Sequence, residues 1–355
     1  MELNKEQLKA VTTTANKVVV IAAPAVGKTR VLTERIKWLL DKGVDPYKIV
    51  AITFTNAAAE EMKARLGERA ARVFIGTVHS YANYLLRSDG RSTTKMLDNE
   101  DFDGLLEEVE TYPSCIQEVK HLLLDEAQDS SELQFSFIFD MVQPENYFIV
   151  GDHRQSIYAF SGGRSDIFYG LTQKEGVTVY HLNENYRNGE NISFFAKQLI
   201  SKLGAMYYDF STTHRGAGSV MQGIYEKNKI GNMIKLNVTN GGKYSDWFIL
   251  TRTNAQIDLL QKHLNEMNIP NETFKRSELD LEGFNAKMAN DTVKVMTMHS
   301  SKGLEAKNVI VYGQRYNNAD EIKLNYVAAT RAENFLYWCS KLNYKPKKKK
   351  EIHTW

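Results

Sequence analysis

The feature that most constrains the fold is an apolar run that leads through a Gly-Lys-Thr turn into an amphipathic helix. Residues 18–23 are rich in valine, as buried strands are, and residues 28–41 place apolar side chains on one helical face. The turn between them reads Ala22-Ala-Pro-Ala-Val-Gly-Lys-Thr29. Backbone N–H groups at such a helix start attract phosphate, Lys28 can reach the β and γ phosphates, and Thr29 can ligate magnesium. We therefore expect a strand, loop and helix that together bind a nucleoside triphosphate.

This loop departs from the usual pattern of phosphate-binding loops. Alanine stands at positions 22, 23 and 25, where such loops usually place at least one more glycine so that the backbone can close around phosphate. Two interpretations stay open. The loop either supports sustained nucleotide turnover or binds nucleotide only weakly.

Short apolar runs alternate with helical segments along most of the chain, which is the rhythm of βαβ units with a mainly parallel sheet. In the first half we expect strands at 18–23, 48–54, 73–79, 121–125 and 147–151. In the second half we expect strands at 247–251, 293–298, 309–312 and 335–338, and helices at 256–267 and 321–331. The pattern predicts an α/β protein built from two units.

The length of 355 residues also fits two domains at roughly 150 residues each. We expect a first domain at 1–186, with a small polar and acidic insertion at about 85–117. A second domain is expected at 187–344, followed by a basic tail at 345–355.

Two carboxylates follow another strand in the first half. The apolar run at 121–125 ends in Asp125 and Glu126, in the same α/β unit as the Gly-Lys-Thr turn. Asp125 is suited to hold magnesium through water, and Glu126 to accept a proton from an attacking water molecule. An isolated Asp-Glu pair after a strand is usually a solvated turn, but its place in this unit favours nucleotide hydrolysis.

Asp125-Glu-Ala-Gln128 and segments on both sides of it resemble, in order, the motifs of superfamily 1 DNA helicases of the UvrD, Rep and PcrA type. The matching segments are Leu3-Asn-Lys-Glu-Gln7, Thr53-Phe-Thr-Asn56, Ala58-Ala-Glu-Glu-Met62, Gly76-Thr-Val-His-Ser80, Val150-Gly-Asp-His-Arg-Gln-Ser-Ile-Tyr158-Ala-Phe160, Leu182-Asn-Glu-Asn-Tyr-Arg187, Val295-Met-Thr-Met-His-Ser-Ser-Lys-Gly-Leu-Glu305 and Tyr326-Val-Ala-Ala-Thr-Arg-Ala-Glu333. The resemblance extends from residue 3 to residue 333. It implies two RecA-like P-loop NTPase domains with parallel sheets and an ATP cleft between them.

The resemblance also assigns nucleotide-binding roles. Gln7 pairs with the adenine edge, and Arg30 and Tyr186 sandwich the ring. Gly303 and Glu305, two residues apart in one motif, also contact the nucleotide, Glu305 through the ribose hydroxyls. The implied catalytic residues are Lys28, Asp125, Glu126, Gln155, which senses the γ phosphate, and the cis arginine fingers Arg187 and Arg331. The implied loop contacts are Ala25, Gly27, Lys28 and Thr29, and the implied magnesium ligands are Thr29 and Asp125.

For DNA, the resemblance implies a single-strand site built on stacking aromatic side chains. Tyr158 and Phe160 match the stacking pair, with Phe54 as a further candidate. The remaining positions that match residues near the DNA backbone are Thr55, Asn56, His79, Arg252, Asn254, Thr297 and His299. Core packing is the alternative interpretation for Phe54 and His79.

The chain differs from the family in its insertions. Members usually carry a large inserted domain in each motor half, whereas only 40 residues separate Ser80 from His121 here. We therefore expect ATP-dependent translocation on single-stranded DNA or 3′-tailed duplex in the family's 3′ to 5′ direction. Unwinding that depends on the inserted domains does not follow from this chain. The alternative is an ATP-regulated DNA clamp or partner-binding module. A protein partner such as a nuclease or a repair or replication factor is expected to supply what the missing insertions do.

Composition sets the remaining expectations. The net charge is +2, but the last eleven residues hold five lysines and one glutamate, so DNA contact in the body must come from local polar and aromatic groups. Two cysteines, Cys115 and Cys339, cannot build a disulfide framework. No apolar run reaches the ~18 residues of a membrane span. We expect a cytoplasmic protein.

Overall fold

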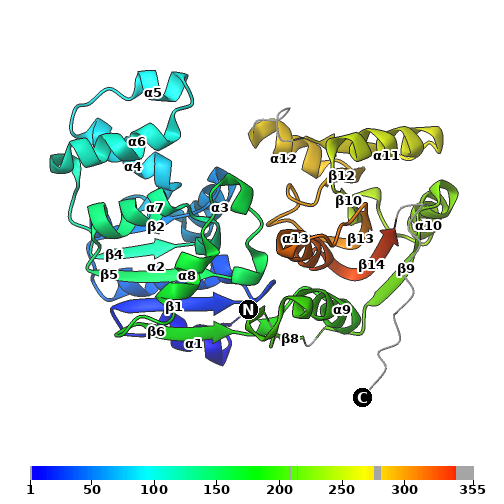
Figure 1. The fold of residues 1–355 in the computed structure, drawn as a ribbon, viewed down its shortest axis with the longest axis horizontal. Coiled ribbons are helices and arrows are strands. Elements are labelled where there is room, and N and C mark those ends of the chain that lie inside the picture. Colours follow the sequence, from blue (N-terminus) through cyan, green and yellow to red (C-terminus); the bar gives the residue numbers. More distant parts are fainter. Residues whose placement is uncertain (1, 208, 214, 276–280, 341–355) are drawn as a thin grey trace, which may run out of the picture. The chain divides into compact units, whose positions relative to one another are not determined.

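The computed structural model describes residues 2–207, 209–213, 215–275 and 281–340, so the expected basic tail at 345–355 lies outside the described residues. The chain forms two compact units (Figure 1). Unit 1 comprises Met1–Arg187 and Leu203–His214, and unit 2 comprises Asn188–Lys202 and Arg215–Trp355. The chain thus leaves unit 1 one residue later than expected, and Leu203–His214, here named the return segment, runs back into it.

Unit 1 is built on a six-stranded parallel sheet with strand order β3-β2-β4-β5-β1-β6. The strands are β1 (Lys17–Ala22), β2 (Ile49–Ile52), β3 (Phe74–Gly76), β4 (His121–Leu124), β5 (Asn146–Gly151) and β6 (Thr178–Leu182). The helices are α1 (Lys5–Val11), α2 (Lys28–Asp41), α3 (Asn56–Leu66), α4 (Val78–Ser88), α5 (Thr94–Asp98), α6 (Phe102–Thr111), α7 (Glu132–Ser136) and α8 (Ser165–Leu171).

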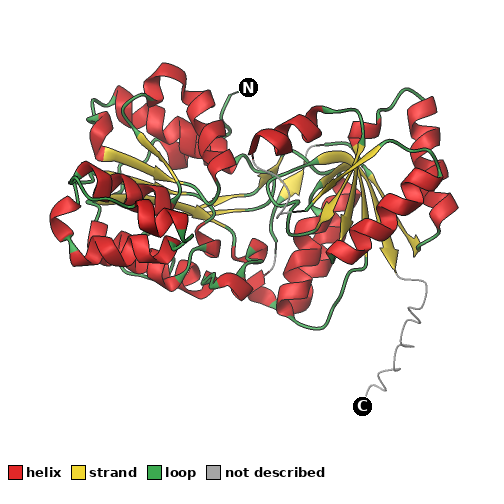
Figure 2. Cartoon of the chain, turned by 90° about the horizontal axis from the view of Figure 1, so that it is seen from above, coloured by secondary structure: helices red, strands yellow, loops and turns green. Residues whose placement is uncertain are grey.

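The apolar strand runs of unit 1 are explained by burial on both faces of this sheet (Figure 2). Val18 and Val20 of β1 pack with α1 and α2 on one face, whereas Val19 packs on the other face with α4, α6 and α8. A two-stranded parallel pair, β7 (Glu184–Asn185) with β8 (Thr212–Thr213), joins the return segment to the chain just before Arg187.

The expected insertion at 85–117 is helical. It holds the end of α4, then α5 and α6, and Leu105, Leu106 and Val109 of α6 are buried against the core next to Leu85. Its acidic residues lie on the outward side of these short helices, which is why the apolar pattern was hard to see in the sequence.

Unit 2 has a second six-stranded parallel sheet, with strand order β11-β12-β10-β13-β14-β9. Its strands are β9 (Ser219–Ile224), β10 (Trp247–Thr251), β11 (Asn271–Phe274), β12 (Val293–Thr297), β13 (Ala306–Tyr312) and β14 (Ala332–Ser340). Its helices are α9 (Glu190–Ile200), α10 (Lys227–Thr239), α11 (Asn254–Glu266), α12 (Leu281–Ala289) and α13 (Ala319–Ala329). The two parallel sheets confirm the expected α/β class.

Strands β6, β9 and β11 and helices α9 and α10 were not expected from the sequence. β6 and β9 are edge strands whose residues are mostly half-buried or exposed, so they lack a continuous apolar run. Over the described residues, no helix combines the length and the apolar character that a membrane crossing requires.

Candidate nucleotide and DNA site

The expected site residues of unit 1 follow the carboxyl ends of its parallel strands. The phosphate loop follows β1, Phe54 follows β2, and Asp125 follows β4. The segment 152–160, here named the coupling loop, follows β5, and Tyr186 follows β6 and β7. Carboxyl ends of parallel strands meet at one edge of a sheet, where such folds bind ligands.

The phosphate loop is closed by two hydrogen bonds from distant segments. Gln7 Nε2 donates to the Val26 carbonyl at 2.9 Å, and the Tyr186 N–H donates to the Ala25 carbonyl at 3.0 Å. Gly27 has φ 78° and begins α2 without a side-chain cap, so the N–H groups of its first turn face the loop as an anion site requires.

Ala25 has φ 62°, in the left-handed region that glycine adopts easily and alanine does not. A left-handed conformation costs an L-residue roughly 1–2 kcal/mol. The loop therefore has the curvature of a phosphate-binding loop, and the alanine adds conformational strain to it.

The loop lysine and the expected base lie in contact. Lys28 Nζ is 2.6 Å from Glu126 Oε1. Asp125 is buried, and its Oδ1 accepts the Glu126 N–H at 2.9 Å, which holds Glu126 in a left-handed turn with φ 49°. The structure thus brings together the lysine and both carboxylates that the sequence indicated.

Gln128 is a further residue of this site, to which its motif alone assigns no role. It is fully buried, and its Nε2 donates to Glu126 Oε2 at 2.6 Å. Its Oε1 accepts the Asp152 N–H at 2.8 Å, so one amide orients the base and contacts the coupling loop. An amide two residues after a carboxylate at a strand end was the signal available in the sequence.

The coupling loop contains a buried charged cluster. Arg154 Nε donates to Asp152 Oδ1 at 2.6 Å, and Gln155 Nε2 donates to Asp152 Oδ2 at 2.8 Å. Burial opposes ionisation of Asp152, but the charges of Arg154 and His153 and these hydrogen bonds outweigh it, so the pKa of Asp152 lies below its ordinary value. Asp152 therefore fixes Gln155, the expected γ-phosphate sensor.

The residues expected around adenine gather beside the phosphate loop. The Gln7 amide accepts the Asn4 N–H at 3.0 Å in addition to its bond to Val26. Tyr186 Oη accepts from Asn4 Nδ2 at 2.7 Å and donates to Glu184 Oε2 at 2.8 Å. Partial burial and the bond to Glu184 raise the pKa of Tyr186, and Arg30 is close enough to oppose this shift.

The two expected arginine fingers belong to different units. The sequence places Arg187 in the second domain, but in the structure it is the last residue of the first part of unit 1. Arg331 lies in unit 2, where its Nε donates to the Val327 carbonyl at 2.9 Å and its Nη1 to the Leu304 carbonyl at 3.2 Å. Arg331 therefore lies next to the segment that carries Gly303 and Glu305.

Aromatic side chains of unit 1 form the expected stacking group. The Phe54 and Tyr158 rings are stacked with centroids 5.0 Å apart, and Tyr158 and Phe160 are 6.0 Å apart. Phe160 is 71% exposed, so a large apolar face is open to solvent. Thr55 and Asn56 are exposed beside this group, where Thr55 accepts the Ala58 N–H and caps α3.

His79 lies against the insertion. Its ring centroid is 5.7 Å from that of Phe102, and its Nε2 is 3.6 Å from Asp103 Oδ1. Burial lowers the pKa of His79 although Asp103 opposes the shift. Packing against α6 therefore occupies much of a side chain that the sequence had assigned to DNA.

The expected DNA residues of unit 2 make internal contacts. Arg252 pairs with Glu321 through two nitrogens, at 3.0 Å for Nε and 2.9 Å for Nη2. Thr297 Oγ1 lies 2.9 Å from Ser300 Oγ, and half-buried His299 lies in the same turn. Asn254 is exposed at the start of α11.

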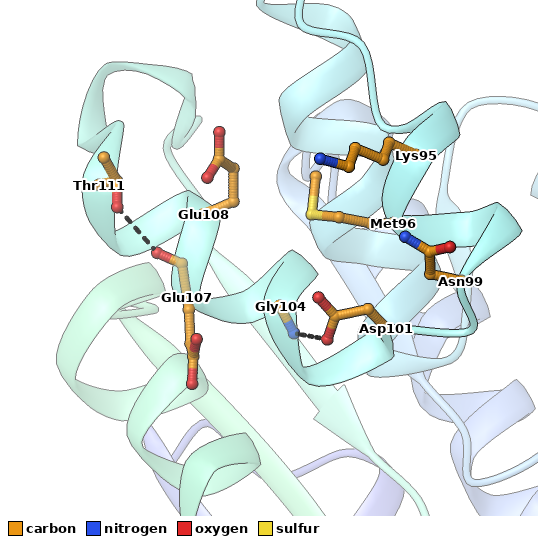
Figure 3. Close-up of a pocket in the computed structure, with 8 residues that line it drawn as sticks. All are labelled: Lys95, Met96, Asn99, Asp101, Gly104, Glu107, Glu108 and Thr111. Atoms are coloured by element: carbon orange, nitrogen blue, oxygen red, sulfur yellow. Dashed lines mark hydrogen bonds between the residues drawn. The ribbon is translucent and has the colours of Figure 1, made fainter.

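The insertion also contains a cavity of about 390 Å³ between α5 and α6 (Figure 3). Its lining residues are Lys95, Met96, Asn99, Asp101, Gly104, Glu107, Glu108 and Thr111. Three carboxylates and one lysine give these walls a negative balance, which disfavours phosphate groups.

A magnesium ion held by Thr29 and Asp125 fits the residues present. Magnesium is usually bound by one or two protein oxygens together with substrate phosphates and water. In the part of the chain that the structure describes, no cluster of three or more His, Cys, Asp or Glu side chains offers an all-protein metal site.

Comparisons with known proteins agree with this arrangement. The N-terminal domain of UvrD/REP helicases matches residues 3–111 and 101–175, and the C-terminal domain of UvrD-like helicases matches residues 180–280 and 271–342. An ATP-dependent DNA helicase PcrA of Staphylococcus epidermidis is 28% identical over 369 residues, covering 76% of this chain and 50% of the relative. A probable DNA helicase of Mycoplasma pneumoniae is 25% identical over 460 residues, covering 95% and 83%.

A probable DNA helicase II homologue of Mycoplasma capricolum is 27% identical and also covers 76% of this chain. The chain spans about half the length of the Staphylococcus PcrA relative and of this homologue. The two domain matches together extend over nearly all of the described residues. The chain therefore belongs to the UvrD/REP helicase family.

Proposed function

We propose that this chain is an ATP-dependent translocase on single-stranded DNA that acts as a DNA helicase on 3′-tailed duplex, moving 3′ to 5′. The contact between Lys28 and Glu126, 2.6 Å apart, is the observation that carries this proposal. It joins a phosphate-binding cation to a carboxylate that can accept a proton, which is what hydrolysis of a γ phosphate needs.

ATP is the proposed substrate, whose γ phosphoryl group passes to water, and a magnesium ion would supply positive charge that stabilises this group during transfer. Lys28 then moves from Glu126 to the β and γ phosphates, so Glu126 becomes available to take a proton from water. Gln128 keeps Glu126 in place through its hydrogen bond of 2.6 Å. Asp125 and Thr29 would hold the metal, and Arg187 and Arg331 would stabilise the negative charge that develops on the γ phosphate.

The aromatic group of unit 1 is the proposed contact with single-stranded DNA. Phe54, Tyr158 and Phe160 offer ring faces on which successive bases of a single strand can stack without regard to sequence. The coupling loop carries Tyr158 and also Gln155, three residues away, which is bonded to Asp152. The residues proposed to stack a base and to sense the γ phosphate therefore lie in one short segment.

The test is ATP turnover with and without oligothymidine. We expect DNA to stimulate hydrolysis in the parent chain and Glu126→Gln to abolish it by at least about 10³-fold, because the base is lost. Glu118→Gln, at an exposed carboxylate paired with Lys48, is the matched control and should hydrolyse normally. Unchanged turnover in Glu126→Gln would reject the mechanism. Fork substrates with a 3′ or a 5′ tail test the direction.

The second candidate function is an ATP-regulated DNA clamp with weak turnover, and the strained Ala25 favours it. A clamp binds DNA in a nucleotide-dependent way but shows little stimulated hydrolysis. Robust DNA-stimulated turnover in the parent chain eliminates this candidate.

The setting of this activity is part of the proposal. We place it in the cytoplasm, with unit 1 and unit 2 as the two motor domains. A nuclease or a repair or replication factor is the proposed partner, because the insertion is small and its cavity is acidic. Retention of the chain by one such purified factor is the corresponding measurement.

A further inference from the structure

We propose that Asp209 and Arg154 form a latch that couples the return segment to the coupling loop, with both acting as positioning residues. The proposal rests on the proposed function, because it concerns how DNA contact at Tyr158 reaches the rest of the motor. Its core is an ion pair between Arg154 Nη1 and Asp209 Oδ1 at 3.4 Å, with each side chain 4% exposed.

The latch has a second contact through the neighbouring histidine. His153 Nε2 lies 2.8 Å from the Met206 carbonyl oxygen, and its ring is 5.3 Å from that of Tyr207. Two consecutive residues of the coupling loop thus hold the return segment at two points. Gln155 comes directly after Arg154, and Tyr158 lies three residues further on. A displacement of the return segment would therefore also shift both of these residues.

Apolar packing beneath the return segment is incomplete. A cavity of about 340 Å³ lies beside the segment in unit 1, and its walls mix apolar residues such as Ile21, Met206 and Phe210 with polar ones such as His153 and Arg154. Phe210 is 70% exposed. Because this space is unfilled, the return segment makes fewer van der Waals contacts with unit 1 than a well-packed segment would. Its polar contacts are therefore a larger part of what holds it in place.

The path of the return segment shows what the latch could couple. The return segment is continuous with α9 of unit 2 on one side and with β9 of unit 2 on the other. It also pairs with residues just before Tyr186, where the Thr212 N–H donates to the Asn183 carbonyl at 2.8 Å. The return segment therefore touches the coupling loop and the nucleotide-side strand while both of its ends lead into unit 2.

Asp209→Asn is the sharpest test of this latch. The amide keeps the oxygen that accepts the Ser211 N–H at 2.8 Å, so the local turn is preserved and only the charge is removed. Arg154 remains paired with Asp152, so no buried charge is left alone. Arg154→Gln, in contrast, leaves two buried carboxylates without their cation and risks unfolding. Arg154→Lys is the conservative variant that should retain function.

The first readout is turnover. We expect Asp209→Asn to keep the DNA-free rate and the KM for ATP but to lose about fivefold to tenfold of the stimulation by oligothymidine, a typical size for coupling between sites. Asp166→Asn removes the exposed pair with Arg164 and is the matched control. A stimulation equal to that of the parent chain would overturn the latch.

The second readout does not depend on hydrolysis. Oligothymidine is expected to slow amide hydrogen exchange in the coupling loop and at residues 209–213 of the parent chain, and only in the coupling loop of Asp209→Asn. If residues 209–213 gain no protection in the parent chain, or keep it in the variant, the latch is wrong. If the parent chain lacks stimulated turnover but shows this pattern, the latch stands and the proposed function fails.

Discussion

The two units share one architecture but use their strand ends differently. In unit 1 the ends of β1 and β4 bring Lys28 and Glu126 into contact, and the ends of β2 and β5 expose the stacked aromatic group. In unit 2, Arg252 after the end of β10 forms an ion pair with Glu321, and Thr297 at the end of β12 hydrogen-bonds Ser300. The two sheets have the same architecture, but one presents reactive and stacking groups and the other internally paired groups. This is expected when function resides in sites placed on a common fold.

The largest expected effect contrasts DNA contact in the two units. Tyr158→Ala removes a stacking face and should weaken oligothymidine binding by about 1–3 kcal/mol, which is roughly fivefold to 150-fold. Arg252→Gln should change the same affinity less than about twofold, because its guanidinium is already used by Glu321. Fluorescence anisotropy measures both, with exposed Tyr47→Ala as a control. Equal losses in the two variants would remove the distinction between the units.

Acidification is expected to weaken unit 1 through His121, at the start of β4. Burial, together with the charges of Arg35 and Lys120, lowers the pKa of His121 from 6.5 to about 4. Between these values the unfolded chain binds a proton that the folded chain does not, so stability falls as the pH decreases from about 6.5 to about 4. His121→Gln should flatten this part of the profile of thermal unfolding, whereas exposed His181→Gln should not. A His121→Gln profile identical to that of the parent chain would contradict the assignment.

The smallest expected effect concerns the strain in the phosphate loop. Ala25→Gly should raise the free energy of unfolding by about 1 kcal/mol, because relief of the left-handed alanine exceeds the entropy cost of glycine. Ala71→Gly, at a residue with φ −53°, should instead destabilise and is the control. Urea unfolding measures the stability, and the KM for ATP shows whether the strain also limits binding. A destabilised Ala25→Gly chain would mean that the loop does not favour the conformation described.

Much of the fold could be predicted because both sheets are parallel and buried. The central strands β1, β4, β5 and β10 contain short uninterrupted apolar runs, and α2 begins and ends where its apolar pattern does. The edge strands β6 and β9 could not be found in this way, because half-exposed residues interrupt their pattern. Helix α6 was missed because its buried Leu105, Leu106 and Val109 are interspersed with acidic residues.

The site was predictable where chemistry and chain position coincide, as for Lys28, Asp125 and Glu126. What the sequence could not indicate were the pairings made in three dimensions. Arg252 and Glu321 are 69 residues apart in the chain. His79 contacts Asp103 because α6, which the sequence pattern does not reveal, packs beside it. Nothing local marks these partners, so a residue that matches a DNA-contacting position can be engaged inside its own unit.

The path of the return segment limits how the protein can be dissected. A fragment that ends at Arg187 would lack Asp209 and the β8 partner of Glu184 and Asn185, although all of these belong to unit 1. A fragment that begins at Asn188 would carry the twelve residues Leu203–His214 of unit 1 between α9 and β9, without the rest of unit 1. No single cut along the backbone yields two intact halves, so each unit is best studied by point substitution in the whole chain.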